Sequence, residues 1–336
     1  MNRRISVIIP NYNGGSTIKT CLDSVYSSNY GNVEVIVIDD CSTDNSVEII
    51  RQFPCTLIQL KKRLGASKAR NTGAERSTGE VLFFLDADCI LAADTLSIAE
   101  RALSREKNLI LGGTYEKIAF DDTFFSTFQS LFVHYSETKK QEPDYIATHA
   151  LIIHADPFRK SGGFAEHFLP ILEDVEFSHR MRSAGYRLNM NPEIRVKHIF
   201  DFTLFASLKN AFRKSFYWTV YSLRRGDLLA DSGTASVELK VNVVSFCLNL
   251  LCILLFSFSG KSVFLVLLIF SFLLSLFINR RLLMSFYRPK GFAFAVLAAL
   301  YYTMVYPLPV GMGAVSGIFK FLLDYTFFKK RAVSRV

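Results

Sequence analysis

An apolar strand that ends in two carboxylates constrains this chain of 336 residues more than any other feature. The run Val81–Leu85 is wholly apolar, and Asp86 and Asp88 follow it one residue apart. A buried carboxylate without a partner is costly, so two of them at a strand tip require a cation. Their spacing suits Mg²⁺ or Mn²⁺ bridging to a phosphate. The alternative is a strand followed by a polar turn, because Asp is a common turn residue.

Short apolar runs alternate with helical patterns through the first hundred residues. The predicted strands are 6–10, 33–38, 56–60 and 81–85, and the predicted helices are 16–26, 44–51, 65–75 and 92–102. This alternation implies βαβ units, so the fold class we predict is α/β with a Rossmann-like, mostly parallel sheet. Nucleotides bind at the carboxyl ends of the strands in such sheets. Beyond residue 109 we expect helices at 120–135 and 174–184 and strands at 150–154 and 194–197.

The last hundred residues carry most of the apolar excess of the composition. Val241–Phe258 and Val263–Ile278 are predicted to form a helical hairpin through a bilayer, and Phe292–Val310 a third span. Each hairpin run is near the short end of the ~17–25 residues that a span needs, so a buried hairpin in a soluble protein is the alternative. Ala314–Phe328 is apolar but contains two charges, and it spans the membrane, re-enters it or lies on its surface.

The net charge of +9 comes largely from basic runs beside these apolar segments. We interpret them as membrane-surface charges, and no pattern in the chain predicts binding to nucleic acid. The aromatic and basic stretch Thr203–Arg225 is predicted to be an interfacial amphipathic helix. The positive-inside rule places the basic stretch 279–290, and the front domain with it, on the cytoplasmic side of the membrane. In a bacterial cell this membrane would be the inner membrane.

Several short motifs follow one another in a fixed order over roughly residues 5–200. They are Ser6–Asn13, Val35–Asp44, Ala69–Gly73, Leu85–Asp88, Gly162–Phe164, Glu173–Asp174 and Arg180–Tyr186. Their order and spacing resemble the family 2 glycosyltransferases, which have the GT-A fold. The resemblance implies a catalytic domain over 1–200, followed by the interfacial helix and linker (201–238) and a transmembrane helical region (239–336).

The resemblance also implies a donor site for a nucleotide sugar, carrying UDP or GDP. Pro10 and Tyr12 would wall the base, and an aromatic ring at Tyr12 suits stacking. Asp40 would accept a hydrogen bond from the base, although Asp39 is an equal candidate and a helix N-cap is the alternative role. Arg70 would pair with the phosphates, the alternatives being a surface arginine or a structural tie to Asp86.

The expected cofactor is Mn²⁺ or Mg²⁺. Asp88 is the predicted direct ligand, and Asp86 would reach the ribose or support the metal, with Ala87 between them also on the donor side. His198 occupies a position at which GT-A enzymes supply a third ligand, although a lone histidine is usually structural. The metal would stabilise the charge of the departing diphosphate.

Asp174 is the predicted general base, which would take the proton of an acceptor hydroxyl. The alternative is a capping role, since acidic residues are favoured at a helix start. Glu173 and Trp218 are predicted to contact the acceptor. One base and one metal imply a single displacement with inversion of the sugar.

Two departures from the family pattern bear on the acceptor. No Gln-x-x-Arg-Trp motif accompanies Trp218, which argues against processive polymer synthesis. No proline follows Asp88 closely, and a phosphate acceptor would need no base, so we expect a hydroxyl acceptor on a lipid or a membrane-associated glycan. A polyprenyl-phosphate glycosyltransferase and a non-catalytic membrane scaffold that binds sugar nucleotides remain the alternatives. Neither the donor sugar nor the oligomeric state can be deduced from the sequence.

Overall fold

The computed structural model describes residues 3–103, 106–167 and 169–333, with side chains up to residue 324. The chain divides into two compact units, Met1–Asp201 and Phe202–Val336. Each is described by itself. The segment predicted as a separate interfacial region, 201–238, falls almost entirely within the second unit.

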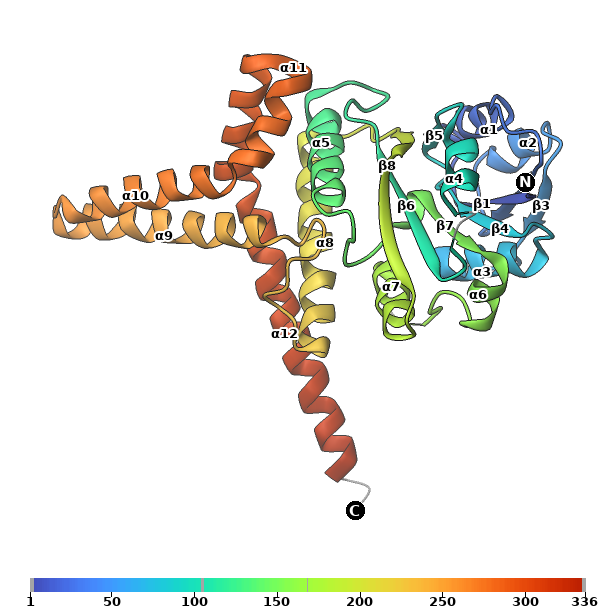
Figure 1. Ribbon diagram of the computed structural model, residues 1–336. Coiled ribbons are helices and arrows are strands. Elements are labelled where there is room, and N and C mark those ends of the chain that lie inside the picture. The colour runs from blue at the N-terminus through green and yellow to red at the C-terminus, as the bar shows by residue number, and fades with distance from the viewer. Residues whose placement is uncertain (1–2, 104–105, 168, 334–336) are drawn as a thin grey trace. The chain divides into compact units, whose positions relative to one another are not determined.

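An eight-stranded sheet with the order β3-β2-β1-β4-β7-β6-β8-β5 runs through the first unit (Figure 1). Its first four strands are parallel, as predicted, and β1, β2 and β4 are largely buried, whereas no residue of β3 is fully buried. The four strands are β3 (Thr56–Gln59), β2 (Val33–Asp39), β1 (Ile5–Asn11) and β4 (Val81–Phe84). The intervening helices are α1 (Ile18–Tyr26), α2 (Ser46–Ile50) and α3 (Ala66–Arg76).

The other half of the sheet is mixed, but β6 is parallel to β8, so among the described residues four of the seven strand pairs are parallel and the sheet is mostly parallel, as expected. The strand predicted near residue 150 exists as β7, but it runs antiparallel to β4 and to β6, and β5 is antiparallel to β8. The remaining strands are β5 (Cys89–Leu91), β6 (Leu109–Tyr115), β7 (Leu151–His154) and β8 (Arg187–His198). Of the twelve residues of β8, only those near its end, 194–197, were predicted to form a strand. The connecting elements are α4 (Thr95–Leu103), α5 (Phe124–Thr138), η1 (Thr148–Ala150), α6 (Ala155–Lys160) and α7 (Glu173–Ser183).

A buried aromatic cluster lies under α3, α6 and α7. Phe84 on β4 packs against Phe158 and Phe164 at ring distances of 5.0 and 5.1 Å, and Phe164 packs against Phe177 of α7 at 4.9 Å. Burial of such side chains supplies much of the stability of a domain. This cluster fixes the start of α7 relative to the end of β4.

The second unit is helical. Its elements are α8 (Leu204–Arg225), α9 (Val237–Ser259), α10 (Val263–Ile278), α11 (Arg280–Leu300), the π-helix η2 (Tyr301–Val305) and α12 (Pro307–Val333). The hairpin of α9 and α10 forms as predicted, and α8 packs along α12 (Figure 1). The prediction that 279–290 forms a loop is wrong, because this basic stretch is helical up to a break at Gly291, where φ is 78°. Proline is tolerated in a first helical turn, so Pro307 and Pro309 begin α12 rather than interrupt it.

Buried amide and hydroxyl groups connect these helices at the base of the hairpin. Asn242 of α9 donates to the carbonyl of Tyr302 at 2.7 Å, and Tyr302 Oη donates to Asn279 at 3.1 Å. A π-helix shifts the backbone hydrogen-bond pattern. The hydrogen bond donated by the Asn242 side chain keeps the buried carbonyl of Tyr302 satisfied.

Candidate active site

The carboxyl ends of β1 and β2 meet at one edge of the sheet. Asn11, at the end of β1, donates to Asp39 Oδ1 at 2.8 Å, and the Ser42 hydroxyl donates to the same oxygen at 2.5 Å. All three groups are wholly or partly buried. Asp39 is therefore committed to ordering the loop after β2.

Asp40, the next residue, orders a different loop. Its carboxylate accepts from the backbone amides of Leu64 and Gly65 at 2.7 and 2.8 Å, and the residue is only 4% exposed. The helix-cap alternative is thus not what the structure shows for Asp40. The two adjacent carboxylates hold the loops on either side of the place where a base was predicted to bind.

Tyr12 lies beside these loops and is 41% exposed. The Arg63 guanidinium carbon stands 3.9 Å from the centre of its ring, a cation–π arrangement. Pro10, in β1, is half-buried. One face of the Tyr12 ring is therefore already covered by a cation that the sequence did not identify as part of the site.

Arg70 joins the end of β4 to the start of α7. Its guanidinium contacts Asp86 Oδ1 at 2.7 Å and Glu173 Oε1 at 2.5 Å, and the residue is 4% exposed. Burial disfavours its charge, but Asp86 and Glu173 outweigh burial and raise the pKa of Arg70. The structure thus supports the alternative foreseen for Arg70, a tie to Asp86, and extends the tie to Glu173.

Two glycines allow this close approach. A Cβ at Gly73 of α3 would lie 2.5 Å from Ile8 Cγ2, so only glycine lets α3 sit this near to β1. Gly163 has φ of +70°, and the turn after it is clamped by Asn71, which accepts from Phe164 N at 2.9 Å and donates to Phe164 O at 2.8 Å. These contacts place Arg70 and α7 together.

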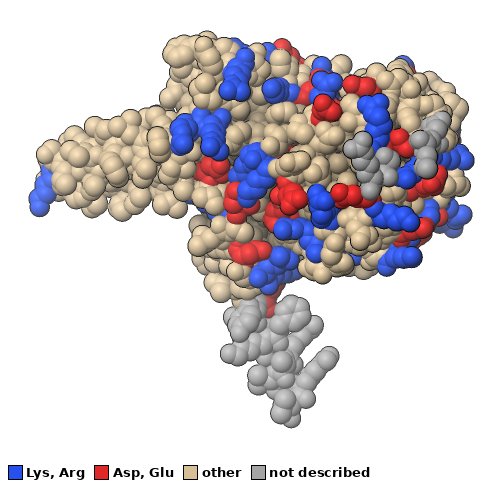
Figure 2. Space-filling model, in the orientation of Figure 1, with Lys and Arg blue, Asp and Glu red and all other residues tan. Residues whose placement is uncertain are grey.

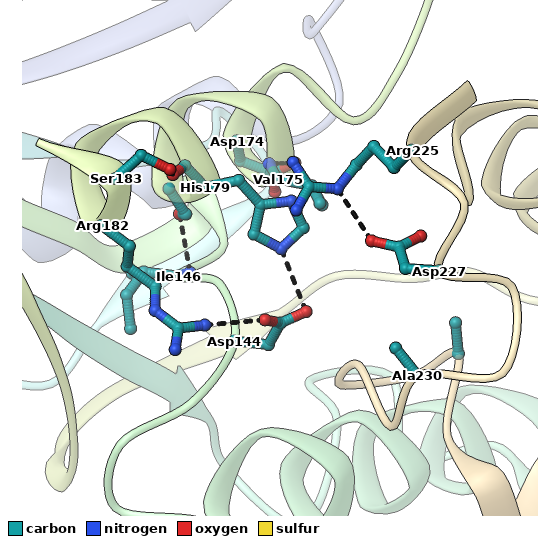
Figure 3. Close-up of polar contacts among 12 residues, drawn as sticks. Asp144, Ile146, Asp174, Val175, His179, Arg182, Ser183, Arg225, Asp227 and Ala230 are labelled. Carbon is teal, nitrogen blue, oxygen red and sulfur yellow. Dashed lines mark hydrogen bonds and ion pairs between the residues drawn. The ribbon is translucent and has the colours of Figure 1, made fainter. Parts of the chain in front are cut away.

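The C-terminal half of α7 is held by Asp144 (Figure 3). His179 Nε2 lies 3.0 Å and Arg182 Nη1 2.8 Å from its two carboxylate oxygens, and the backbone amide of Ile146 donates to Ser178 Oγ at 3.0 Å. The helix that carries Glu173 and Asp174 is therefore anchored at both ends.

Asp88 faces a second group of side chains. Its Oδ2 lies 3.5 Å from His198 Nε2, and one ligand atom each from Asp88, Cys89 and His198 lie within 4.8 Å of one another. Of the predicted metal ligands, the structure brings Asp88 and His198 together, whereas Asp86 faces Arg70. Ala87 lies in the turn between the two carboxylates. A carboxylate and an imidazole within this distance have the donor atoms that suit Mn²⁺, so the residues fit the implied metal.

The pKa values of Asp86 and Asp88 are shifted in opposite directions. Burial works against ionisation of Asp86, but the Arg70 guanidinium outweighs it and holds the pKa of Asp86 below its ordinary value. Burial raises the pKa of Asp88, although His198 opposes the shift. Among the described residues, the ion-pair partner of Asp88 is His198 at 3.5 Å, farther than Arg70 is from Asp86, which agrees with a site for a bound cation.

A buried aromatic layer lies behind His198. Tyr115 stacks on His149 with ring centres 4.1 Å apart and meets the His198 ring edge-on at 5.0 Å. His149 Nε2 lies 3.5 Å from Glu137 Oε2, which also accepts from the Thr114 hydroxyl at 2.8 Å. None of these four residues behind His198 was identified from the sequence.

Asp174 is half-buried in the first turn of α7, and its Oδ1 accepts from the next backbone amide at 2.8 Å. Its charge acts on both Arg70 and His149, the two groups on which the charge of Asp86 also acts. Glu173, predicted to contact the acceptor, pairs with Arg70, and its contact with an acceptor stays a prediction. Trp218 lies in the second unit, edge-on to Tyr221, and is not among the side chains that the first unit brings together.

The family model described as "Glycosyl transferase family 2" matches residues 6–161. The glycosyltransferase AglE of Haloferax volcanii is 31% identical over 201 residues, which cover 56% of this chain and 65% of AglE. The UDP-Glc:α-D-GlcNAc-diphosphoundecaprenol β-1,3-glucosyltransferase WfgD of Escherichia coli is 33% identical over 117 residues, 34% of this chain and 46% of WfgD. The chain thus spans less than two thirds of either relative.

A solved mannosyltransferase from Pyrobaculum calidifontis, in complex with GDP-Man and Mn²⁺, superimposes with a TM-score of 0.59 at 19% identity. The match covers 96% of this chain and 88% of that one. At this identity the similarity is one of fold, and it confirms the predicted α/β, GT-A architecture followed by helices.

Proposed function

Because the N-terminal unit belongs to glycosyl transferase family 2, we propose that this chain transfers a sugar, with inversion, from a nucleotide-sugar donor to a hydroxyl of a lipid-linked or membrane-associated acceptor. The observation that carries the proposal is the pair of clusters at one sheet edge. Asp88 and His198 form one, and Arg70 connects Asp86 with the start of α7 in the other.

The donor base would bind beside Tyr12, between the loops that Asp39 and Asp40 hold. Those carboxylates already accept several hydrogen bonds, so we assign them mainly to shaping the pocket wall. Arg63, over Tyr12, would add positive charge near the diphosphate. WfgD, whose name specifies UDP-Glc, and the mannosyltransferase solved with GDP-Man support a nucleotide-sugar donor.

Asp88 and His198 would hold Mn²⁺ or Mg²⁺. When bound, that ion supplies charge stabilisation to the departing diphosphate. Asp86, fixed by Arg70, would then orient the donor sugar or ribose rather than bind the ion directly. The same guanidinium, through Glu173, sets the position of α7.

Asp174 would act as the general base. It lies one residue after Glu173, in the turn that Arg70 fixes, and it is half-buried rather than free to move in solvent. Its carboxylate would accept the proton of the acceptor hydroxyl as that oxygen attacks the anomeric carbon from the face opposite the diphosphate. A single displacement of this kind inverts the configuration of the sugar.

The second unit would anchor the enzyme in a membrane with the catalytic unit on the cytoplasmic face. Val237–Ser259 and Arg280–Asp324 are long and apolar enough to cross a bilayer, since each contains an 18-residue stretch of high mean hydropathy, 2.3 and 1.6, and Val263–Ile278 is apolar but shorter. Between Val241 and Asn279 the sequence has one charged residue, Lys261. In Figure 2 the hairpin of α9 and α10 projects as an uncharged surface with basic atoms at its tip. WfgD, whose name specifies a lipid-diphosphate acceptor, supports this setting.

The test is release of nucleoside diphosphate from a panel of sugar nucleotides by the full-length protein in membranes, with lipid acceptors and Mn²⁺. We expect Asp174→Asn to lower kcat by ~10²–10⁴-fold with little change in KM. A protein that turns over no sugar nucleotide, or an Asp174→Asn variant with full turnover, would overturn the proposal. A product with a mild-acid-labile phosphate linkage would instead identify the polyprenyl-phosphate alternative.

A further inference from the structure

Cys89 lies beside Asp88 and His198, and no motif of the sequence assigns it a role. In the antiparallel pair β5–β8, Cys89 is directly opposite His198. Directly opposed residues point to the same face of a sheet, with Cβ atoms about 5 Å apart. The pairing therefore sets a thiol and an imidazole side by side, next to the Asp88 carboxylate.

The separations of these side chains are close to those of a metal centre. Cys89 Sγ lies 3.9 Å from Asp88 Oδ1, His198 Nε2 lies 3.5 Å from Asp88 Oδ2, and all three ligand atoms fall within 4.8 Å of one another. In a tetrahedral site with bonds of about 2.0–2.3 Å, neighbouring ligand atoms are about 3.3–3.8 Å apart. A contraction of about 1 Å or less would bring this cluster around one ion.

The donor set also selects among metals. Mg²⁺ takes oxygen ligands, and carboxylates suit Mn²⁺, whereas thiolate favours Zn²⁺ and other thiophilic ions. The general order of affinity rises from Mn²⁺ to Co²⁺, and Zn²⁺ lies above Mn²⁺ as well. A set of one oxygen, one nitrogen and one sulfur is typical of Zn²⁺ or Co²⁺ rather than of Mg²⁺.

We propose that Cys89 Sγ is a third protein ligand at this site, and that the chain binds Zn²⁺ or Co²⁺ through Asp88, Cys89 and His198 in competition with the Mn²⁺ or Mg²⁺ of the transfer reaction. The identity of the competing ion, Mn²⁺ or Mg²⁺, rests on the proposed function, whereas the binding of Zn²⁺ or Co²⁺ does not. When the ion binds, the S–H bond of Cys89 breaks, an S–metal bond forms, and the proton passes to the buffer. Three protein ligands leave the fourth position of a tetrahedral ion open.

The experiment is a titration of the purified full-length protein with Co²⁺ alone, in a non-thiol reductant. A thiolate–Co²⁺ charge-transfer band is expected, saturating at one equivalent and suppressed by added Zn²⁺. The band should be lost in Cys89→Ser and Cys89→Ala and weakened in His198→Gln. It should persist in Cys55→Ser, because Cys55 is half-buried between α2 and β3, away from the cluster.

A wild-type protein without the band, or a band that survives in both Cys89 variants, would overturn the proposal. So would loss of the band in Cys21→Ser with retention in Cys89→Ser, because Cys21, whose thiol lies 3.6 Å from the Asp86 carbonyl, would then be the ligand. Thermal melting of each variant shows whether it is folded. Sugar transfer without the band refutes only the role of Cys89, whereas the band without transfer refutes only the proposed function.

Discussion

At the scale of single residues, Arg70 determines how the site is held together. One buried guanidinium neutralises carboxylates from two elements that are far apart in sequence, Asp86 after β4 and Glu173 on α7. Replacing a buried ion pair by apolar groups can be neutral, but removing one partner leaves uncompensated buried charge.

Arg70→Met is therefore expected to destabilise the protein by about 3 kcal/mol or more, measured by urea unfolding of the full-length chain. The matched control is Arg76→Met in the last turn of the same helix, an exposed position where we expect a change within about 0.5 kcal/mol. Adding Glu173→Gln to Arg70→Met should recover part of the loss. Equal stability of the Arg70 and Arg76 variants would show that Arg70 is not the tie.

His149 gives the site a pH dependence. Burial lowers its pKa, but Glu137, Asp86 and Asp174 outweigh burial and raise the pKa of His149 above its ordinary value of 6.5. A histidine whose pKa is higher in the folded than in the unfolded state stabilises the fold while protonated. That contribution is fully present below about pH 6.5 and is lost as the pH rises through the folded pKa.

The free energy of unfolding of the wild type, minus that of His149→Gln, should accordingly fall as the pH rises above 6.5. Glu137→Gln removes the acidic partner and should flatten the same profile. A difference between wild type and His149→Gln that does not change with pH would contradict this assignment.

At the scale of elements, glycines set the packing of α8 against α12. A Cβ at Gly317 would lie 2.7 Å from the Phe216 carbonyl oxygen and 2.9 Å from Thr219 Cβ, whereas a Cβ at Gly311 meets only Val243 Cγ1 at 3.5 Å. Small residues at a helix interface allow such close approach of backbones. Backbone atoms cannot move aside as a flexible side chain can.

Gly317→Ala is thus expected to cost about 1–3 kcal/mol, and Gly311→Ala on the same helix to cost little. The single tryptophan of the chain, Trp218, lies on α8 and reports the transition by fluorescence during thermal unfolding. If both variants melt together with the wild type, the helices are not packed as closely as the structure shows.

Among the strands, some could be predicted from the sequence and others could not. The four parallel strands were found because each is a local apolar run between turn signals. β5 has three residues and exists mainly through its pairing with β8, and the long β8, which contains Pro192 and charged residues, exists mainly through its pairing with β5 and β6. Cys89 was missed for that reason, since only its pairing places it opposite His198. Asp88 was predicted as a ligand because it lies in a motif, and His198 because it occupies a position at which the resembled family supplies a third ligand.

At the scale of the whole chain, the proposed membrane anchor rests on the length and the exposed apolar surface of the helical hairpin. α9 is about 34 Å long and α10 about 24 Å at 1.5 Å per residue, against a hydrocarbon thickness of about 30 Å. Leu254 on α9 is 56% exposed, so a charge there removes little packing within the protein.

In a bilayer, Leu254→Lys should cost about 2.5–3.5 kcal/mol, and the paired change with Leu251→Lys more. We expect the double variant to fold in detergent but to lose much of its carbonate-resistant membrane association in cells. Lys261→Glu, at the hairpin tip, is the charge control. Unchanged membrane association of the double variant would mean that α9 does not contact lipid.

The central claim is that Asp88, which follows β4, binds together with His198 a divalent ion that in turn binds a nucleoside diphosphate. The most direct measurement is calorimetric titration of the full-length protein with UDP and with GDP, each with and without Mn²⁺, on the wild type and Asp88→Asn. One of the two nucleotides should bind the wild type only with Mn²⁺, and Asp88→Asn should bind neither. Binding that is equal without Mn²⁺, or equal in Asp88→Asn, would contradict the account.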